Sequence, residues 1–127
     1  MLRFLLILVL AYPAGVFFPW WWAIVVAFLV GLLMSEKKRR RVFGKQQVPA
    51  RAFLAGFLAL FLLWGVMVFW INGQNEGILA EKVAQLISAN PPISGPYLLI
   101  LISALMGGLI GGFGAMTGNL LGEAMRN

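Results

Sequence analysis

The chain has 127 residues, of which 61% are hydrophobic and only 11% are charged. A soluble domain usually carries about 25% charged residues, so this composition excludes a water-soluble monomer of this size. The length supports a single domain, residues 1–127, and we expect an integral membrane protein. Any function then comes from the membrane segments or their short connections.

The missing residue types narrow the possible chemistry. The chain has no cysteine and no histidine, which removes thiolate nucleophiles, imidazole bases and the two commonest transition-metal ligands. No pair of acids falls inside an apolar stretch, so a two-carboxylate site is not expected. We therefore predict a protein that is not an enzyme, with no catalytic residues, no metal and no cofactor. The four acids are Glu36, Glu76, Glu81 and Glu123.

The first charge-free stretch, residues 4–35, suits either one long tilted helix or two short ones. Pro13 and Pro19 favour two helices, because two prolines so close together break a helix unless neighbours compensate. We predict helices at residues 2–17 and 20–34, both slightly short for a bilayer.

Two later stretches each fit one membrane crossing, which needs about 20 apolar residues. They are residues 52–71 and 97–122. With the two helices before residue 35, the expected fold is an all-α membrane bundle of four transmembrane helices.

The basic residues predict the orientation, because cytoplasmic loops carry the excess of lysine and arginine. With the N-terminus inside, Arg3, the seven basic residues between positions 37 and 51, and Arg126 all lie on the cytoplasmic side. Only Lys82 lies outside. We therefore expect both termini in the cytoplasm, whereas a three-helix alternative would place Arg3 outside.

Aromatic residues support the same orientation. Tryptophan and tyrosine prefer the headgroup level of a membrane, where one part of the ring is apolar and another is wet. With both termini inside, five of them fall at the outer interface and are expected to act as anchors. They are Trp20, Trp21, Trp22, Trp70 and Tyr97.

The outer loop, residues 72–96, contains an amphipathic segment at residues 78–89. Asn90, Pro91 and Pro92 end it. We expect a short helix that lies flat on the membrane or caps the bundle. Its apolar face comprises Leu79, Val83, Leu86 and Ile87, and its polar face comprises Glu81, Lys82, Gln85 and Ser88.

Glycine is concentrated in the last predicted helix. On a helical wheel the small residues fall within one half, and bulky residues such as Leu109 and Phe113 fall on the other. In lipid a smooth face lets helix backbones approach and gain dispersion contacts, so we predict close packing along it. This glycine face consists of Ala104, Gly107, Gly108, Gly111, Gly112, Gly114, Gly118 and Gly122.

The sequence leaves open what packs against the glycine face. Another helix of the same bundle is favoured over a partner chain, and a groove for a substrate or lipid is a third possibility. Asn119 lies beside the face and Thr117 lies nearer the bulky side. Both are expected to form hydrogen bonds with a neighbouring helix.

A basic run lies in the predicted cytoplasmic loop, residues 35–51. The simplest interpretation is that it keeps this loop inside. A functional interpretation is contact with anionic lipid headgroups or an acidic partner, at about 1 kcal/mol per basic residue. Nucleic-acid binding is disfavoured, because the loop has no fold to position a groove contact. The run is Lys37, Lys38, Arg39, Arg40 and Arg41.

Three segments carry a resemblance to known proteins. They are Phe-Pro-Trp-Trp at residues 18–21, Arg-Ala-Phe-Leu-Ala-Gly-Phe at 51–57, and Gly-Gly-Leu-Ile-Gly-Gly at 107–112 with Thr117 and Gly118 after it. The chain resembles small, uncharacterised four-helix integral membrane proteins of Gram-negative bacteria. The resemblance implies a location in the bacterial inner (cytoplasmic) membrane and supplies no activity.

The leading hypothesis is a non-catalytic accessory or assembly subunit of a larger inner-membrane complex. The small size, the missing catalytic groups and a helix face suited to close docking favour it. The alternative is a self-assembling small channel or transporter, with a pathway between copies. The expected partners are other membrane protein subunits or copies of the same chain, together with anionic lipid headgroups.

Overall fold

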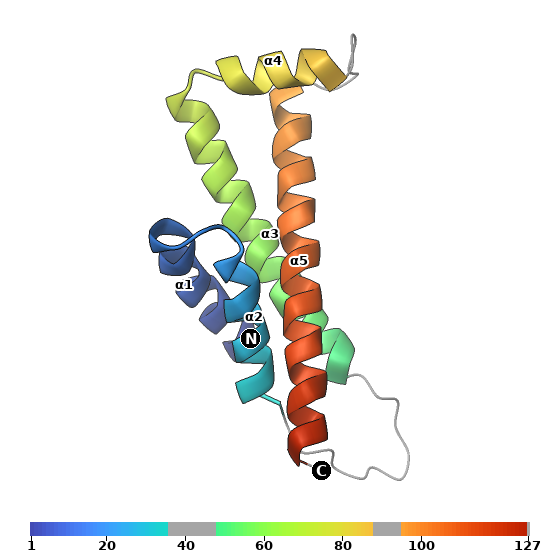
Figure 1. The fold of residues 1–127 in the computed structure, drawn as a ribbon. Coiled ribbons are helices and arrows are strands. Elements are labelled where there is room, and N and C mark those ends of the chain that lie inside the picture. The colour runs from blue at the N-terminus through green and yellow to red at the C-terminus, as the bar shows by residue number, and fades with distance from the viewer. Residues whose placement is uncertain (36–47, 88–94, 127) are drawn as a thin grey trace.

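The computed structural model describes residues 1–35, 48–87 and 95–126. Within these ranges every regular element is an α-helix and there is no strand, which confirms the predicted all-α class for this part of the chain. Figure 1 shows a long arrangement with α4 across one end, here called the α4 end, and the last turn of α5 at the other, the Arg126 end. The helices are α1 (Leu2–Phe17), α2 (Trp22–Leu33), α3 (Val48–Gln74), α4 (Ile78–Ile87) and α5 (Gly95–Arg126).

The first charge-free stretch folds as two helices and not as one. α1 ends at Phe17, and the following residue, Phe18, has an extended backbone. Pro19 lies in the turn, where its carbonyl oxygen accepts a hydrogen bond of 2.9 Å from the Trp22 N–H group. A proline in a turn removes no helical hydrogen bond, so the chain reverses here, whereas Pro13 is accommodated inside α1. α2 begins at Trp22, after the predicted residue 20.

Two helices are long and apolar enough to cross a membrane. They contain the stretches Ala50–Gln74 and Tyr97–Arg126. Only 22% and 39% of their most apolar windows are buried inside the molecule, whereas the core helix of a soluble protein is mostly buried. α1 and α2, with 16 and 12 residues, are about 24 and 18 Å long. A hydrocarbon core of about 30 Å is thicker than either, so two of the four predicted spans reach full length.

The long helices extend past their predicted ends. α3 starts at Val48, before the predicted residue 52, and α5 covers Gly95–Arg126 where residues 97–122 were predicted. The prediction followed apolar residues alone. A helix continues into polar sequence while its backbone hydrogen bonds remain satisfied, and so its ends lie outside the apolar stretch.

A tight turn joins α3 to α4. The Gly77 N–H group donates to the Asn72 carbonyl oxygen at 3.0 Å, and Glu76 has a left-handed backbone with φ of 53°. This is a Schellman helix end, in which the position of Glu76 is usually glycine. The turn directs α4 across the ends of α3 and α5, where it packs mainly against α5.

α4 covers residues 78–87 of the predicted amphipathic helix. Three residues of its predicted polar face, Glu81, Lys82 and Gln85, are exposed, as expected for that face. The predicted apolar face is covered only in part, because Val83 is half-buried whereas Leu86 is 87% exposed. The side chains of Leu79 and Ile87, and the whole of Ser88, lie outside the described residues.

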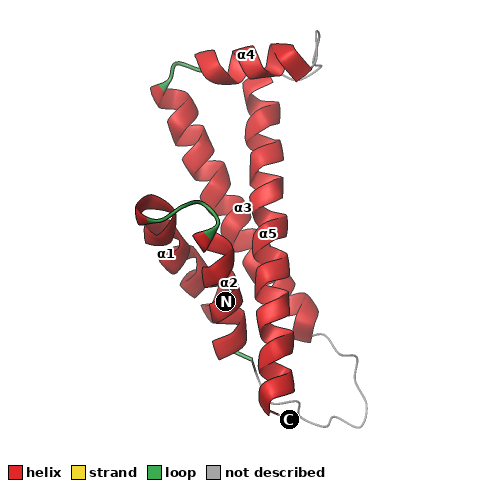
Figure 2. Ribbon diagram, viewed as in Figure 1, coloured by secondary structure: helices red, strands yellow, loops and turns green. Residues whose placement is uncertain are grey.

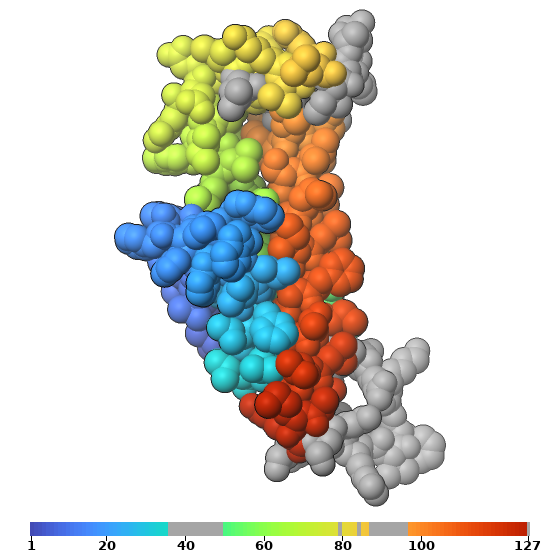
Figure 3. Space-filling view, viewed as in Figure 1, coloured from blue at the N-terminus to red at the C-terminus, as the bar shows by residue number. Residues whose placement is uncertain are grey.

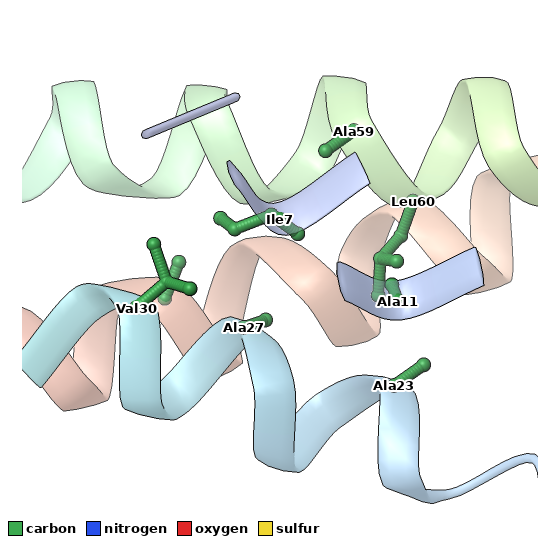
Figure 4. Close-up of a cluster of buried hydrophobic side chains, with 8 residues drawn as sticks. Ile7, Ala11, Ala23, Ala27, Val30, Ala59 and Leu60 are labelled. Atoms are coloured by element: carbon green, nitrogen blue, oxygen red, sulfur yellow. The ribbon is translucent and has the colours of Figure 1, made fainter. Parts of the chain in front are cut away.

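A small core holds α1, α2 and α3 together beside α5. Most of its residues are alanines, so the helix axes come close to one another. α5 packs against both α2 and α3, and α1 covers α2 and α3. Figure 4 shows Ile7 and Ala11 of α1, Ala23, Ala27 and Val30 of α2, and Ala59 and Leu60 of α3 in this cluster.

The hairpin of α1 and α2 reaches only part of the way along α3 and α5. Its turn lies beside their middle, and α3 and α5 continue beyond it to α4 (Figures 1 and 3). The ring of Trp20 in the turn lies edge-on to Trp64 of α3, with 6.4 Å between centroids. The Trp64 ring in turn packs over Gly107 of α5. Among the helices that the structure describes, only α3 and α5 continue beyond this level toward α4.

Candidate functional site: the glycine face, a polar cluster and an apolar groove

The glycine face of α5 is buried against two helices of the same chain. All eight of its residues are buried. The face divides along its length, with α2 covering the part nearer the Arg126 end and α3 covering the rest. Gly114, Gly118 and Gly122 face α2, whereas Gly107, Gly108, Gly111 and Gly112 face α3, and Ala104 lies against Gly65 of α3.

The approach of α5 to α2 leaves no room for a side chain. A Cβ atom at Gly122 would lie 2.6 Å from the Leu32 carbonyl oxygen, and one at Gly118 would overlap the Phe28 carbonyl oxygen. A backbone carbonyl inside a helix cannot move aside as a flexible side chain can. Glycine is therefore required at these two positions by close approach.

The helices that receive the glycine face carry small residues of their own, which the sequence analysis missed. On α2, Ala23, Ala27 and Gly31 are buried at intervals of four residues. On α3, Gly56 is buried, and a Cβ atom there would overlap the Gly111 carbonyl oxygen. Small residues four apart are a known signal for close helix packing. The pattern in α2 could therefore have identified α2 as a partner of the glycine face.

A buried amide connects α1, α2 and α5 at the Arg126 end. Asn119 is fully buried, and its Oδ1 accepts a hydrogen bond of 2.9 Å from Nη1 of Arg3. The Asn119 Nδ2 donates to Oε1 of Glu123 at 3.0 Å, and the second Arg3 nitrogen donates to the Met34 carbonyl oxygen. Because a buried amide is costly unless it is paired, these contacts fix how the three helices meet. The predicted use of Asn119, a bond to a neighbouring helix, is what the structure contains.

Arg126 forms hydrogen bonds with backbone carbonyl oxygens at the same end of α2. Its guanidinium donates to the carbonyl oxygens of Leu33, at 3.1 Å, and Ser35. The last carbonyls of a helix have no partner within it and carry the negative end of its dipole, so a cation stabilises them. In the sequence alone, Arg3 and Arg126 serve only as markers of orientation. Their meeting at α2 depends on the tertiary fold, which no local pattern signals.

The five predicted aromatic anchors do not lie at one level. Trp20 lies beside Trp64, and Trp70 is about 9 Å farther along α3. Tyr97 is about 15 Å farther along α5 than Gly107, over which Trp64 packs. The predicted anchors therefore lie at different heights along α3 and α5, and their role at the outer interface stays a prediction.

An apolar groove of about 370 Å³ lies between α3 and α5, toward the α4 end. Two small residues, Gly65 and Ala104, lie against each other in it, and a Cβ atom at Gly65 would be 3.5 Å from that of Ala104. The sequence analysis did not predict this groove, because it arises from the way two helices lie against each other. Its lining is Phe61, Gly65, Val66, Phe69, Tyr97, Ile100, Leu101 and Ala104.

Other predicted features contribute less. Thr117 is exposed, on the opposite side of α5 from the buried glycine face. Within the described residues no group of three or more acidic side chains is positioned to hold a metal. The basic run Lys37, Lys38, Arg39, Arg40 and Arg41 lies outside the described residues.

Comparisons with protein-family models, curated proteins and solved structures found no match to this chain. The resemblance to small membrane proteins of Gram-negative bacteria therefore stays a prediction based on three sequence segments.

Proposed function

We propose that this chain is a non-catalytic multi-pass protein of the bacterial inner membrane, and that it acts as an accessory or assembly subunit of a larger complex. The observation that carries the proposal is the uncovered apolar groove between α3 and α5. Toward the Arg126 end these two helices pack against α1 and α2. Toward the α4 end neither α1 nor α2 covers their apolar side chains among the described residues, and the groove can receive side chains of a further helix.

The exposed faces of the long helices support the membrane location. On α3, Leu54, Leu58 and Leu62 are exposed at intervals of one turn. On α5, Leu109 and Phe113 continue the same kind of stripe. Lipid is the preferred solvent of such stripes, whereas in water they would drive aggregation. Charged residues lie near the two ends, with Arg3, Glu123 and Arg126 in the contacts at the Arg126 end, and Glu76, Glu81 and Lys82 in α4 and the turn before it.

The chemistry of the groove supports a helix as its ligand. Gly65 and Ala104 lie against each other and have almost no side chain, so an apolar side chain of a partner helix can enter the groove between the larger residues around them. Close approach increases dispersion contacts, which are the main source of helix association where lipid already solvates apolar side chains. We assign the α4 end to the outer side, and the Arg126 end with the basic run to the cytoplasm and its anionic headgroups.

The proposal is tested by extracting the tagged chain from its native membrane in a mild detergent and measuring the native mass and composition of the purified species. We expect other membrane proteins in fixed stoichiometry. Leu101→Trp fills the groove and should release them. Leu120→Trp is the matched control, because Leu120 is similarly exposed on α5 but does not line the groove, and it should retain the complex.

The same measurement separates the two hypotheses. A species that contains only copies of this chain, and that is unchanged by Leu101→Trp, would overturn the accessory role. It would favour the alternative, a self-assembling small channel or transporter, and flux through reconstituted vesicles would be the next measurement.

A further inference from the structure

We propose that the protein thins the bilayer on one side, where the headgroup layer at the α4 end is drawn toward the tryptophans of the α1–α2 turn. This inference rests on the membrane location proposed above and is independent of the partner complex. The α1–α2 turn then contacts the polar headgroup layer of the lipid bilayer.

The apolar surface of the protein ends at two heights. On the hairpin side it ends at the turn, residues 18–21, beside Trp64. On α3 it continues to Trp70, about 9 Å farther, and on α5 it continues from Gly107 to Tyr97, about 15 Å farther. Figure 3 shows this step, with the hairpin ending well short of α4.

The part of α3 and α5 beyond the turn needs hydrocarbon. Ile102 and Leu105 of α5 are exposed there and do not line the groove. No charged residue occurs between positions 52 and 75 or between 97 and 122. A bilayer that was thin all round the molecule would therefore leave this apolar surface in water, at a cost proportional to its area.

The turn, in contrast, does not suit hydrocarbon. Residues 18–21 are not helical, and although the carbonyl oxygens of residues 19–21 accept turn hydrogen bonds, the N–H groups of Trp20 and Trp21 have no backbone partner among the described residues. An unpaired peptide group in contact with lipid chains costs several kcal/mol. Trp20 is 65% and Trp21 is 47% exposed, so their indole N–H groups are free to find acceptors among headgroups. Phe17 and Phe18 are exposed beside them and fit the adjoining acyl region.

The length of the hairpin determines how far the bilayer beside it is thinned. α1 is its longer helix and measures about 24 Å, so the hydrocarbon beside it is at most about that thick, against about 30 Å in an undisturbed bilayer. Bilayers adapt to short apolar segments by thinning, at fractions of a kcal/mol per ångström. This cost is smaller than that of placing the turn in hydrocarbon. Thinning is therefore the preferred solution.

Tryptophan depth tests the proposal. Trp64→Phe with Trp70→Phe leaves only Trp20 and Trp21 of the turn and Trp22 at the start of α2. A matched variant with Trp20, Trp21, Trp22 and Trp64 changed to Phe leaves only Trp70. Both full-length chains are placed in phosphatidylcholine vesicles with a nitroxide quencher near the headgroup or near the chain end. We expect severalfold stronger quenching by the headgroup quencher for both variants.

A second measurement leaves the tryptophans unchanged. The chain has no cysteine, so Phe18→Cys and Val66→Cys each give one spin-labelling site. Val66 lies only two residues beyond Trp64, and the two labels therefore have similar heights. A thinned bilayer makes the label at residue 18 accessible to a water-soluble relaxation agent and the label at residue 66 accessible to oxygen dissolved in hydrocarbon.

Three outcomes would overturn thinning. If the turn tryptophans respond to the chain-end quencher while Trp70 responds to the headgroup quencher, the bilayer is not thinned but the membrane location stands. If the turn is protected from both quenchers while Trp70 is not, a second copy of the chain covers it. If neither the headgroup quencher nor the chain-end quencher lowers the tryptophan fluorescence of either variant, the membrane location is wrong. The proposed function is then wrong as well.

Discussion

Gly118 lies at the closest approach of α5 to α2, where a side chain would meet the Phe28 carbonyl oxygen. We expect Gly118→Ala to lower the free energy of unfolding by about 1–3 kcal/mol, because an added methyl group against backbone forces the helices apart. Gly15→Ala is the control, since nothing lies within 4 Å of its Cβ position. It should be neutral or stabilising by up to about 1 kcal/mol through helix propensity.

Unfolding in mixed micelles with increasing denaturing detergent, followed by circular dichroism, compares the two glycine variants. Equal losses of stability in both would mean that helix propensity, and not close approach, decides the effect.

Arg3 connects the start of α1 to α2 and α5. Arg3→Met leaves the buried Asn119 oxygen and the Met34 carbonyl oxygen without this donor, so we expect a loss of about 2–3 kcal/mol in the same unfolding experiment. Arg51 is exposed, and Arg51→Met should change stability by no more than about 0.5 kcal/mol. Arg3→Lys should recover only part of the loss, because an ammonium group lacks the fork that reaches both acceptors.

At Ser35 we predict a substitution that stabilises the protein instead of destabilising it. Its Oγ is buried without a hydrogen-bond partner among the described residues. Ser35→Ala removes this unpaired group and is expected to raise the free energy of unfolding by about 1 kcal/mol. A loss of stability on this substitution would show that the hydroxyl has an essential partner.

At the scale of elements, the hydrophobic pattern of the sequence predicts which segments form helices. The range predicted for the first helix, 2–17, coincides with α1, because Pro19 marks the chain reversal in the sequence itself. The relative heights of the helices could not be predicted in this way. They depend on contacts such as that between Gly114 and Ile24, which fix α2 along α5, and hydropathy carries no information about such an axial position.

The packing of α3 on α5 gives an element-scale prediction. The rings of Phe53 and Phe113 are 5.3 Å apart, so cysteines at these two positions should join the helices through a short crosslinker. Gly111→Leu is expected to abolish the crosslink, because its Cβ atom would lie 2.5 Å from the Gly56 carbonyl oxygen. Leu109→Ala, at an exposed position, should leave it intact. A crosslink that survives Gly111→Leu would show that the helices do not depend on close approach.

At the scale of the whole molecule, the small-residue face was predictable and the groove was not. A helical wheel places Gly107 and Gly118 on one side of α5 whatever surrounds them. The groove around Gly65 instead depends on how far the hairpin extends and how α3 and α5 diverge. Both follow from packing between segments distant in sequence.

The orientation is testable by labelling in intact cells. Gln85→Cys on α4 and Met125→Cys at the Arg126 end are both exposed positions in a chain without cysteine. We expect a membrane-impermeant maleimide, once admitted through the outer membrane, to label position 85 directly and position 125 only after the inner membrane is permeabilised. The reverse pattern would invert the proposed topology.

The two arginines at the end of α2 also have a consequence for biosynthesis. Arg126 reaches the Ser35 carbonyl oxygen across 91 residues of sequence, and Arg3 reaches Asn119 across 116. At a synthesis rate of about 5–20 residues per second, α2 waits several seconds after it is made before α5 supplies these partners. During that interval the Leu33 and Ser35 carbonyl oxygens, which accept from Arg126 in the finished fold, depend on water or headgroups, whereas Arg3 of α1 is already present. A ribosome that stalls within α5 therefore leaves a hairpin whose polar end lacks the contacts that Arg126 and Asn119 supply.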